Sequence, residues 1–175
     1  MRNIPKPAAG EYAPYASMYI DLLPDDGRVL EHLQANLAVM QALVRGLPAE
    51  KLIIPWAAGE WTIQEILVHI IDDERIYSYR ALRSARNDST ELPGFDQEIF
   101  AAASDSNERS LDDIFEEYGA VRAATITLFK NVKDEALARA SVANGHTMSV
   151  RAAAYHIAGH ELHHMNSIRD HYLQD

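Results

Sequence analysis

The sequence predicts an all-α protein, a four-helix bundle with an N-terminal extended arm and a long crossover that carries a short helix. Three observations support this fold class. Four long stretches repeat apolar side chains at helical spacing, capping residues precede them, and no series of alternating strands occurs. A length of 175 residues suits one compact unit, so we expect residues 1–175 to form a single domain.

Composition narrows the classes of function. With 47% hydrophobic and 24% charged residues the chain has an ordinary globular composition, and a net charge of -10 disfavours nucleic acid as a partner. No apolar run has the length of a membrane span and no signal-peptide core begins the chain, so we expect a cytoplasmic protein without a membrane partner. Because cysteine is absent, any metal must be held by nitrogen and oxygen.

The first elements are an arm and a helix. Prolines and tyrosines in residues 1–23 predict an extended arm that packs across the body of the protein. Pro24-Asp25-Asp26-Gly27 then supplies turn and capping residues for the first long helix, expected over about 26–47. Gly46-Leu47-Pro48 closes this helix.

The second helix has the clearest start signal. Thr62 and Glu65 form a capping box, and the apolar pattern continues from there to about Arg86. Residues 88–110 contain Pro93-Gly94 and a short amphipathic piece, Asp96 to Ala103. We therefore expect a long crossover with a small helix inside it.

Serine caps announce the last two long helices. Ser110 precedes the third, and Ser149 precedes the fourth, which runs to Tyr172. Between them we expect a short helical turn near Asp134 to Leu137 and a small hairpin around Asn144-Gly145.

Histidines are concentrated in the last helix, which holds four of the chain's eight within residues 155–165. His160 and His164 are four residues apart and share a helix face, so they are the predicted pair of metal ligands. His163 falls toward the solvent side and is expected at the rim. His156, His163 and His171 are reserve ligands.

A metal in the core of a bundle needs a ligand from a facing helix, and His69 on the second helix is the natural donor. The alternative for His69 is a core histidine with a hydrogen-bond partner. Asp73, one turn later, would orient His69 or supply an oxygen ligand, or else be an exposed carboxylate. Trp61, Tyr77 and Arg80 are candidates for lining a pocket, with packing or surface roles as the alternative.

A rival interpretation uses the same residues. His160-Glu161-Leu162-His163-His164 matches the H-E-x-x-H pattern of zinc metalloproteases, in which Glu161 would be the base. We disfavour it because only eleven residues follow His164 and no strand-rich half exists to hold a peptide. Glu161 is instead expected to cap, pack or form a salt bridge.

Several segments together resemble the DinB-like superfamily over nearly the whole chain. They are Gly10–Tyr15, Gly59–Thr62 with His69 following, Asp73–Arg75, Arg80–Leu82 with Arg86–Asp88, and Ala158–His164. The resemblance implies a four-helix bundle whose divalent metal is bound by His69, His160 and His164. It also implies kinship with bacillithiol transferases and mycothiol-dependent maleylpyruvate isomerases, and hence a low-molecular-weight thiol as cofactor. The family is named for DNA-damage induction, which is no evidence of DNA binding.

Two classes of function follow. Three neutral imidazoles leave a coordination position open, as in catalytic zinc sites, and nickel, manganese or iron accept the same ligands. Zinc or nickel is our expectation, in an enzyme that acts on a small molecule as a thiol S-transferase or a hydrolase. The alternative is a non-catalytic metal-binding stress-response module or a homodimeric scaffold, in which the arm would cross a partner.

Overall fold

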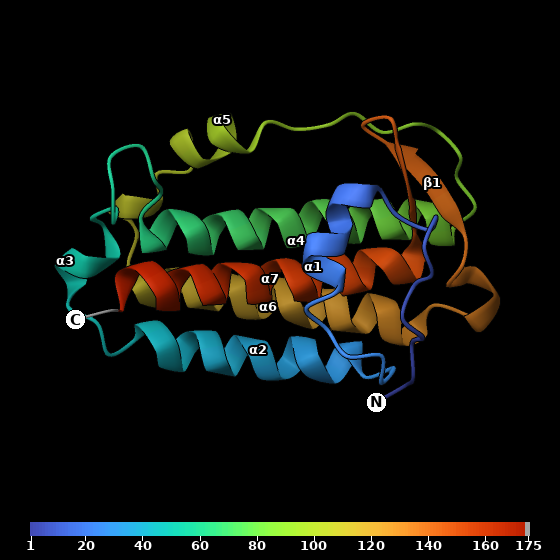
Figure 1. Cartoon of the computed structure of the whole chain (residues 1–175), viewed down its shortest axis with the longest axis horizontal. Helices are drawn as coiled ribbons and strands as arrows, with labels where there is room; N and C mark the ends of the chain where they lie inside the picture. Colours follow the sequence, from blue (N-terminus) through green and yellow to red (C-terminus); the bar gives the residue numbers. More distant parts are fainter. Residues whose placement is uncertain (174–175) are drawn as a thin grey trace.

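The computed structural model describes residues 1–173, and within them four long helices form a bundle (Figure 1). They are α2 (Val29–Val44), α4 (Ile63–Ala85), α6 (Leu111–Asn131) and α7 (Val150–Tyr172). The predicted helical bundle is confirmed, although α2 is shorter than the expected 26–47. Gly27 has a φ of +70°, a left-handed conformation that cannot belong to a right-handed helix, so α2 begins after it.

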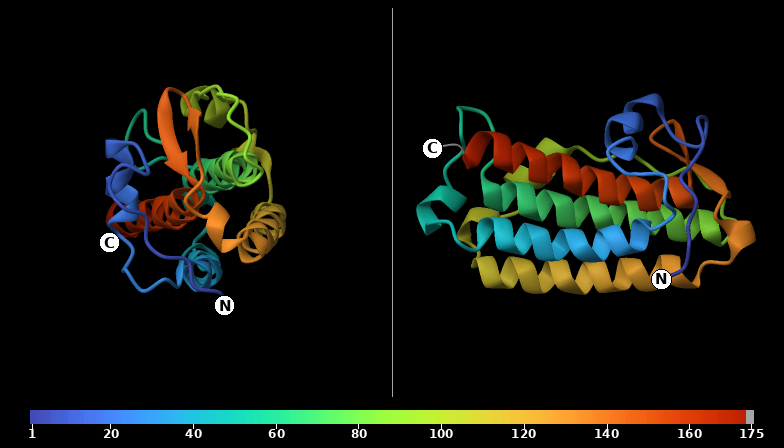
Figure 2. Two further views of the ribbon diagram at one scale, coloured as in Figure 1. Left: turned by 90° about the vertical axis from the view of Figure 1, so that its right-hand side faces the viewer. Right: turned by 60° about the horizontal axis from the view of Figure 1, so that its bottom comes forward.

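Two of the three pairs of consecutive long helices, α2 with α4 and α6 with α7, lie diagonally across the bundle. α4 packs against α6 and α7, and α2 packs against the same two helices from the opposite corner (Figure 2). α4 and α6 run in the same direction, because Arg75 meets Glu117 while Ser78 meets Thr125. The crossover between them therefore returns along the length of the bundle (Figure 1).

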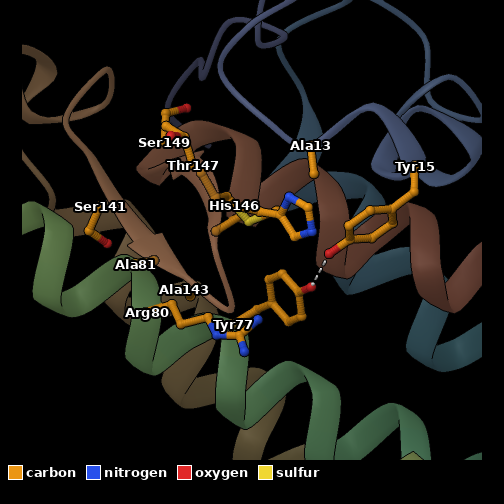
Figure 3. A pocket seen from close by; sticks show the side chains of 12 residues that line it. Ala13, Tyr15, Tyr77, Arg80, Ala81, Ser141, Ala143, His146, Thr147 and Ser149 are labelled. Carbon is orange, nitrogen blue, oxygen red and sulfur yellow. Dashed lines mark hydrogen bonds between the residues drawn. The ribbon is translucent and has the colours of Figure 1, made fainter. Parts of the chain in front are cut away.

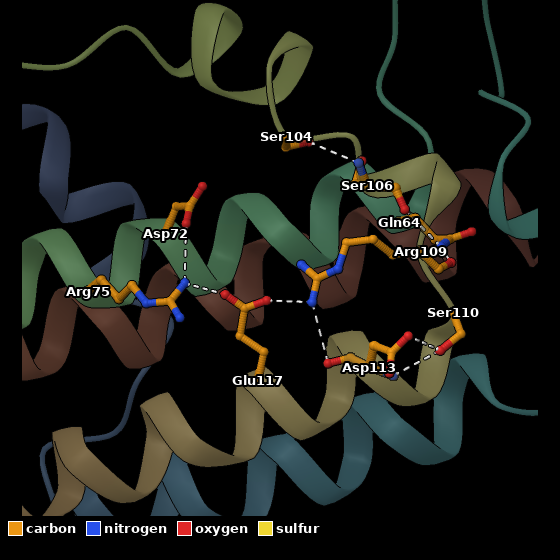
Figure 4. A network of polar contacts seen from close by, with 9 residues as sticks. All are labelled: Gln64, Asp72, Arg75, Ser104, Ser106, Arg109, Ser110, Asp113 and Glu117. Atoms are coloured by element: carbon orange, nitrogen blue, oxygen red, sulfur yellow. Dashed lines mark hydrogen bonds and ion pairs between the residues drawn. The ribbon is translucent and has the colours of Figure 1, made fainter.

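Short elements fill the connections. α3 (Ala49–Leu52) follows α2, and the crossover carries α5 (Gln97–Ala102) and a 3-10 turn at Ser106–Glu108. Another 3-10 turn, Asp134–Ala136, lies where the sequence predicts one. A polar network fixes the end of the crossover, because Glu117 on α6 accepts from both Arg75 and Arg109, and Gln64 donates to the carbonyls of Ser106 and Arg109 (Figure 4).

The expected hairpin is present as two antiparallel strands, β1 (Ala140–Ala143) and β2 (His146–Ser149). Asn144 and Gly145 occupy its turn with φ values of +51° and +72°, the pair of left-handed residues that a two-residue hairpin turn requires. Leu92 of the crossover hydrogen-bonds to both Val142 and Asn144, so the crossover is tied to the hairpin.

The arm differs from the prediction of an extended segment over residues 1–23. Pro14–Ala16 form a 3-10 turn and Ser17–Ile20 form the short helix α1, because Pro14 is compatible with the first turn of a helix. α1 lies directly on α7 (Figure 1). Gly159 permits this approach, since a Cβ there would stand 2.2 Å from the carbonyl oxygen of Tyr19.

Capping follows the sequence signals. Thr62 and Glu65 form both hydrogen bonds of the capping box, while Ser110 and Ser149 accept from backbone amides of α6 and α7. Two apolar clusters fill the bundle, one toward the hairpin end and one toward α3. Polar residues of α4 and α7 are buried between them. None of the helices in the described part combines the length and the apolar character needed to cross a membrane.

Candidate metal centre

Three imidazoles converge between α4 and α7. The Nε2 atom of His160 lies 3.0 Å from Nε2 of His69 and 3.1 Å from Nε2 of His164. His69 and His160 are buried and His164 is partly exposed. We call these three residues the histidine cluster. The structure thus brings together the three residues predicted as ligands, one from α4 and two from successive turns of α7.

The geometry of the histidine cluster fits a small divalent cation. The three ligand atoms all lie within 4.8 Å of one another. Two nitrogens that bind one zinc tetrahedrally at about 2.1 Å would stand roughly 3.4 Å apart. The two observed separations are slightly shorter than this value, so a small rotation of the rings that moves the nitrogens apart would accommodate the ion.

The chemistry of the donors also fits. Burial lowers the pKa of His69, that of His160 to about 3, and that of His164 to well below its ordinary value. At neutral pH all three rings are therefore uncharged, the form in which an imidazole nitrogen has a lone pair to offer a cation. An imidazolium ion would instead repel the metal.

Asp73 supports the histidine cluster from behind. Its Oδ2 lies 3.4 Å from Nδ1 of His160 and 3.5 Å from Nε2 of His156. Burial alone would raise the pKa of Asp73, but His160 and His156 hold it well below its usual range, so the carboxylate is charged. A carboxylate beside Nδ1 favours the tautomer that carries its proton on Nδ1, which leaves the lone pair of Nε2 free to bind a cation. Asp73 therefore serves His160 and not His69, the partner that the sequence suggested.

The reserve histidines lie outside the cluster. His156 is buried and stacks on Tyr77 with ring centroids 3.7 Å apart. His163 lies at the rim, as expected, with its ring 5.3 Å from that of Tyr19. His171 stacks on Trp56 near the end of α7. None of these three contributes a nitrogen to the group of converging ligand atoms.

Two cavities reach the histidine cluster. One, of about 270 Å³, is lined by His164 and Trp61, and the ring of Trp61 lies 4.6 Å from that of His69. The other, of about 150 Å³, is lined by His160 together with Tyr77 and Arg80. The candidate pocket residues Trp61, Tyr77 and Arg80 thus all line space beside the cluster.

Sequence reasoning missed contributions from the arm and the crossover. The ring of Tyr19 on α1 lies edge-on to His156, His160 and His163 at centroid distances of 5.1 to 5.3 Å. Glu98 on α5 accepts a hydrogen bond of 3.1 Å from Nε1 of Trp61, and Gln97 lines both cavities. The one sequence signal for Tyr19 was a glycine inside a helix, which often marks the close approach of another backbone.

Glu161, the next residue after His160, faces away from the histidine cluster. It belongs to a second buried group, the arginine cluster, made of Glu74, Tyr118, Arg122 and Glu161. Nη2 of Arg122 lies 2.9 Å from Glu74 and 3.0 Å from Glu161, and Tyr118 donates to Glu161. Burial alone would lower the pKa of Arg122, but Glu161, Tyr118 and Glu74 hold it well above its ordinary value. Glu161 therefore does not occupy the position of a metalloprotease base, in agreement with the sequence argument.

Comparisons with known proteins identify relatives of the whole bundle. The family model described as the DinB superfamily matches residues 32–168. A protein of Oceanobacillus iheyensis named "Putative metal-dependent hydrolase OB0413" is 30% identical over 129 residues, which cover 72% of this chain and 73% of that protein. The structure of YfiT from Bacillus subtilis, described as a probable metal-dependent hydrolase with an unusual four-helix bundle topology, is similar with a TM-score of 0.71. It is 15% identical, and the match covers 83% of this chain and 87% of YfiT.

Proposed function

Because the chain belongs to the DinB superfamily, we propose that it is a divalent-metal-dependent hydrolase of a small molecule, with the metal held by His69, His160 and His164. The observation that carries the proposal is the convergence of three neutral imidazole nitrogens beside two cavities. The name of the Oceanobacillus relative supports the same reaction class. Zinc or nickel suits a site built only of nitrogen ligands.

When bound, such a metal acts as a Lewis acid that polarises a carbonyl or phosphoryl oxygen and lowers the pKa of water. The chain itself orients the ligands and shields the site. The Asp73 carboxylate lies beside Nδ1 of His160 and favours its Nδ1–H tautomer, while Tyr19 and Trp61 pack against the imidazoles and limit the access of bulk water.

Glu98 is the residue that we propose as proton acceptor. It lines the cavity that reaches His164, and its orientation is fixed by the Nε1–H of Trp61. It can accept the proton that an attacking water gives up and pass it to the leaving group. With no cysteine in the chain, the protein has no thiol nucleophile of its own.

The proposal is tested with metal-free protein that is loaded with one equivalent of zinc or nickel. Loaded wild-type protein should hydrolyse small activated esters or amides, and His164→Ala should not. His32→Ala, which removes a histidine that pairs with Asp26 and lines neither cavity, should retain the activity. Hydrolysis that persists unchanged after His164→Ala, or that is absent in every metal-loaded preparation, contradicts the proposal.

The same preparations separate hydrolysis from the other functions expected from the sequence. Turnover only in the presence of a low-molecular-weight thiol and an electrophile would replace hydrolysis by S-transfer. A large loss of stability on chelation, without turnover of any kind, would indicate a structural metal. Cytoplasmic location and a homodimer stay predictions, and sedimentation of the purified protein tests the second.

A further inference from the structure

Arg80 is an unusual arginine in this chain because it is buried without an acidic partner. Its exposed fraction is 9%, and among residues 1–173 it forms no ion pair. Its one hydrogen bond to protein is a long one, 3.4 Å, from Nη2 to the carbonyl oxygen of Pro93. The other arginine buried to this degree, Arg122, is paired with two glutamates. A buried guanidinium with unused donors is costly unless another group accepts from it.

The guanidinium of Arg80 lies beside the cavity that reaches the histidine cluster. Its Cζ stands 4.7 Å from the centroid of the Tyr77 ring, and both residues line the cavity of about 150 Å³ together with His160. Figure 3 shows a neighbouring pocket that shares Tyr15, Tyr77 and Arg80 with this cavity; Tyr77 extends from α4 toward Tyr15, and the guanidinium of Arg80 lies beside the Tyr77 ring. The hydroxyl groups of Tyr15 and Tyr77 are 3.3 Å apart at this end of the cavity.

The wall between Arg80 and His160 is aromatic. Tyr77 stacks on His156, whose plane is in turn nearly parallel to that of His160, and Tyr19 and Phe95 line the same space. Neither ring nitrogen of His156 makes a hydrogen bond within the described residues. The cavity therefore has an unpaired cation at one end, the candidate metal centre at the other, and ring faces between them. Gln97 and Asn144 add polar groups to the same lining, so it suits a small molecule with an anionic end whose carbon chain lies against the ring faces.

The charge balance favours a carboxylate over a phosphate. Among the described residues that line the cavity, Arg80 is the sole arginine or lysine, and the Asp73 carboxylate lines the same space. One guanidinium matches a single carboxylate through two parallel hydrogen bonds. A dianionic group would carry a second negative charge toward Asp73 without a second cation to balance it.

We propose that Arg80 binds the carboxylate of the substrate, so that the hydrolase acts on small carboxylic acids whose ester or amide bond lies at the far end of the molecule. This inference rests on the proposed function. Tyr77, the residue that the guanidinium covers, is eight residues after His69 on α4, an axial rise of about 12 Å. The carboxylate sits one hydrogen bond nearer the metal centre, so an extended chain of somewhat less than this length separates it from the scissile bond.

Binding to metal-free protein tests the inference without catalysis. Suberic acid monoamide carries one carboxylate and one amide at the two ends of an extended chain, and suberamide is its neutral counterpart. We expect the monoamide to shift the amide resonances of Tyr77 and Asn144 in NMR titrations, and suberamide to bind much more weakly. Arg80→Gln should raise the Kd of the monoamide about ten- to a hundredfold and leave that of suberamide unchanged. Arg83→Gln, whose arginine pairs with Asp88 outside the cavity, is the matched control and should bind as the wild type does.

Several outcomes overturn the inference. One is equal affinity of the wild type and Arg80→Gln for the monoamide, and another is absence of monoamide binding to the wild type. The wild type binding the neutral diamide as tightly as the monoamide, or a phosphonate of the same length more tightly, also overturns it. Arg80→Lys should give an intermediate Kd, because lysine keeps the charge but not the planar fork. If Arg80→Gln does not fold, the resonance map of the wild type and the Arg80→Lys titration decide the question.

The two proposals fail separately. Binding that depends on Arg80, with no hydrolysis by the metal-loaded protein, overturns the hydrolase and leaves the carboxylate site standing. Hydrolysis at equal rates of a neutral ester and its carboxylate-bearing counterpart, with no effect of Arg80→Gln on the ratio, overturns the carboxylate site alone.

Discussion

The histidine cluster and the arginine cluster lie back to back in the same bundle, and adjacent residues of α7 belong to them. His160 faces one and Glu161 faces the other, since neighbouring positions on a helix point about 100° apart. The arginine cluster is fully buried, and the histidine cluster is buried except for the partly exposed His164. They differ in complementarity. Arg122 donates hydrogen bonds to Glu74 and forms an ion pair with Glu161, whereas the three imidazoles turn the same kind of atom toward one point.

The difference shows that buried polar groups can either stabilise the fold or form a binding site for a cation. In the arginine cluster the charges balance within the protein, and hydrogen bonds from Arg122 to Glu74 and from Tyr118 to Glu161 tie α4, α6 and α7 together. The histidine cluster is complete only when a cation shares its nitrogens, so it adds little to the stability of the metal-free protein. Metal binding to the native state alone would stabilise it by mass action, about 2.7 kcal/mol at a hundredfold excess of free metal over Kd.

Breaking the arginine cluster should give the largest effect on folding. Arg122→Met leaves Glu74 and Glu161 buried without their cation, so we expect the free energy of unfolding to fall by about 3–5 kcal/mol. Urea denaturation followed by circular dichroism measures it. Arg169→Met, at an exposed position of α7, should change stability by less than about 0.5 kcal/mol. A similar loss in both variants would mean that the arginine cluster does not support the bundle.

Removing a ligand of the histidine cluster should instead lower metal affinity strongly and change the stability of the metal-free protein little. His164→Ala should weaken zinc binding by at least about a hundredfold, because first-layer ligands matter more than their supporting partners, while the metal-free protein should keep nearly its wild-type stability. Competition with a chromophoric chelator gives the affinity, and His163→Ala serves as the adjacent control. If His164→Ala binds zinc as the wild type does, the ligands must be sought among His156, His163 and His171.

The support of the histidine cluster by Asp73 should have a smaller effect. Asp73→Asn removes the charge beside Nδ1 of His160, and we expect metal affinity to fall about ten- to a hundredfold. Asp72→Asn is the matched control, since Asp72 pairs with Arg75 on the outer side of α4. Equal affinities of the two variants would remove Asp73 from the account of the site.

The sequence predicted those features of the fold and the site that depend on residues close together in the chain. Capping residues and apolar spacing located the long helices, because these signals act within one element. The i, i+4 spacing put His160 and His164 on one face, and the need for a ligand from a facing helix pointed to His69, which the family resemblance also implied. The histidine partner predicted for Asp73 was wrong, because whether Asp73 lies beside His69 or His160 depends on how α4 packs against α7.

The arm was the least predictable part near the site. Its prolines indicated extended chain, but α1 forms because it can pack on the bare backbone of Gly159. No local signal at Tyr19 indicated that its ring would cover the imidazoles. Contacts of this kind depend on tertiary packing, which overrides local preference.

The attachment of the arm should show the smallest effect, and it depends on pH. Partial burial works against ionisation of Glu11, but hydrogen bonds from Arg151 and Ser149 lower its pKa below 4.5. A carboxyl group with a lowered folded pKa adds stability above its unfolded pKa, and this is lost as pH falls through the folded value. Glu11→Gln should thus cost up to about 1 kcal/mol at pH 7 and progressively less below about pH 4.5. A cost that does not change with pH would show that ionisation of Glu11 plays no part.

Anomalous X-ray scattering from crystals of the zinc-loaded protein tests the central claim most directly. We predict one strong peak between α4 and α7, about 2.1 Å from the Nε2 atoms of His69, His160 and His164. No comparable peak should appear in the arginine cluster. A peak at other residues, or none in protein that binds zinc stoichiometrically in solution, would contradict the assignment of the histidine cluster as the metal centre.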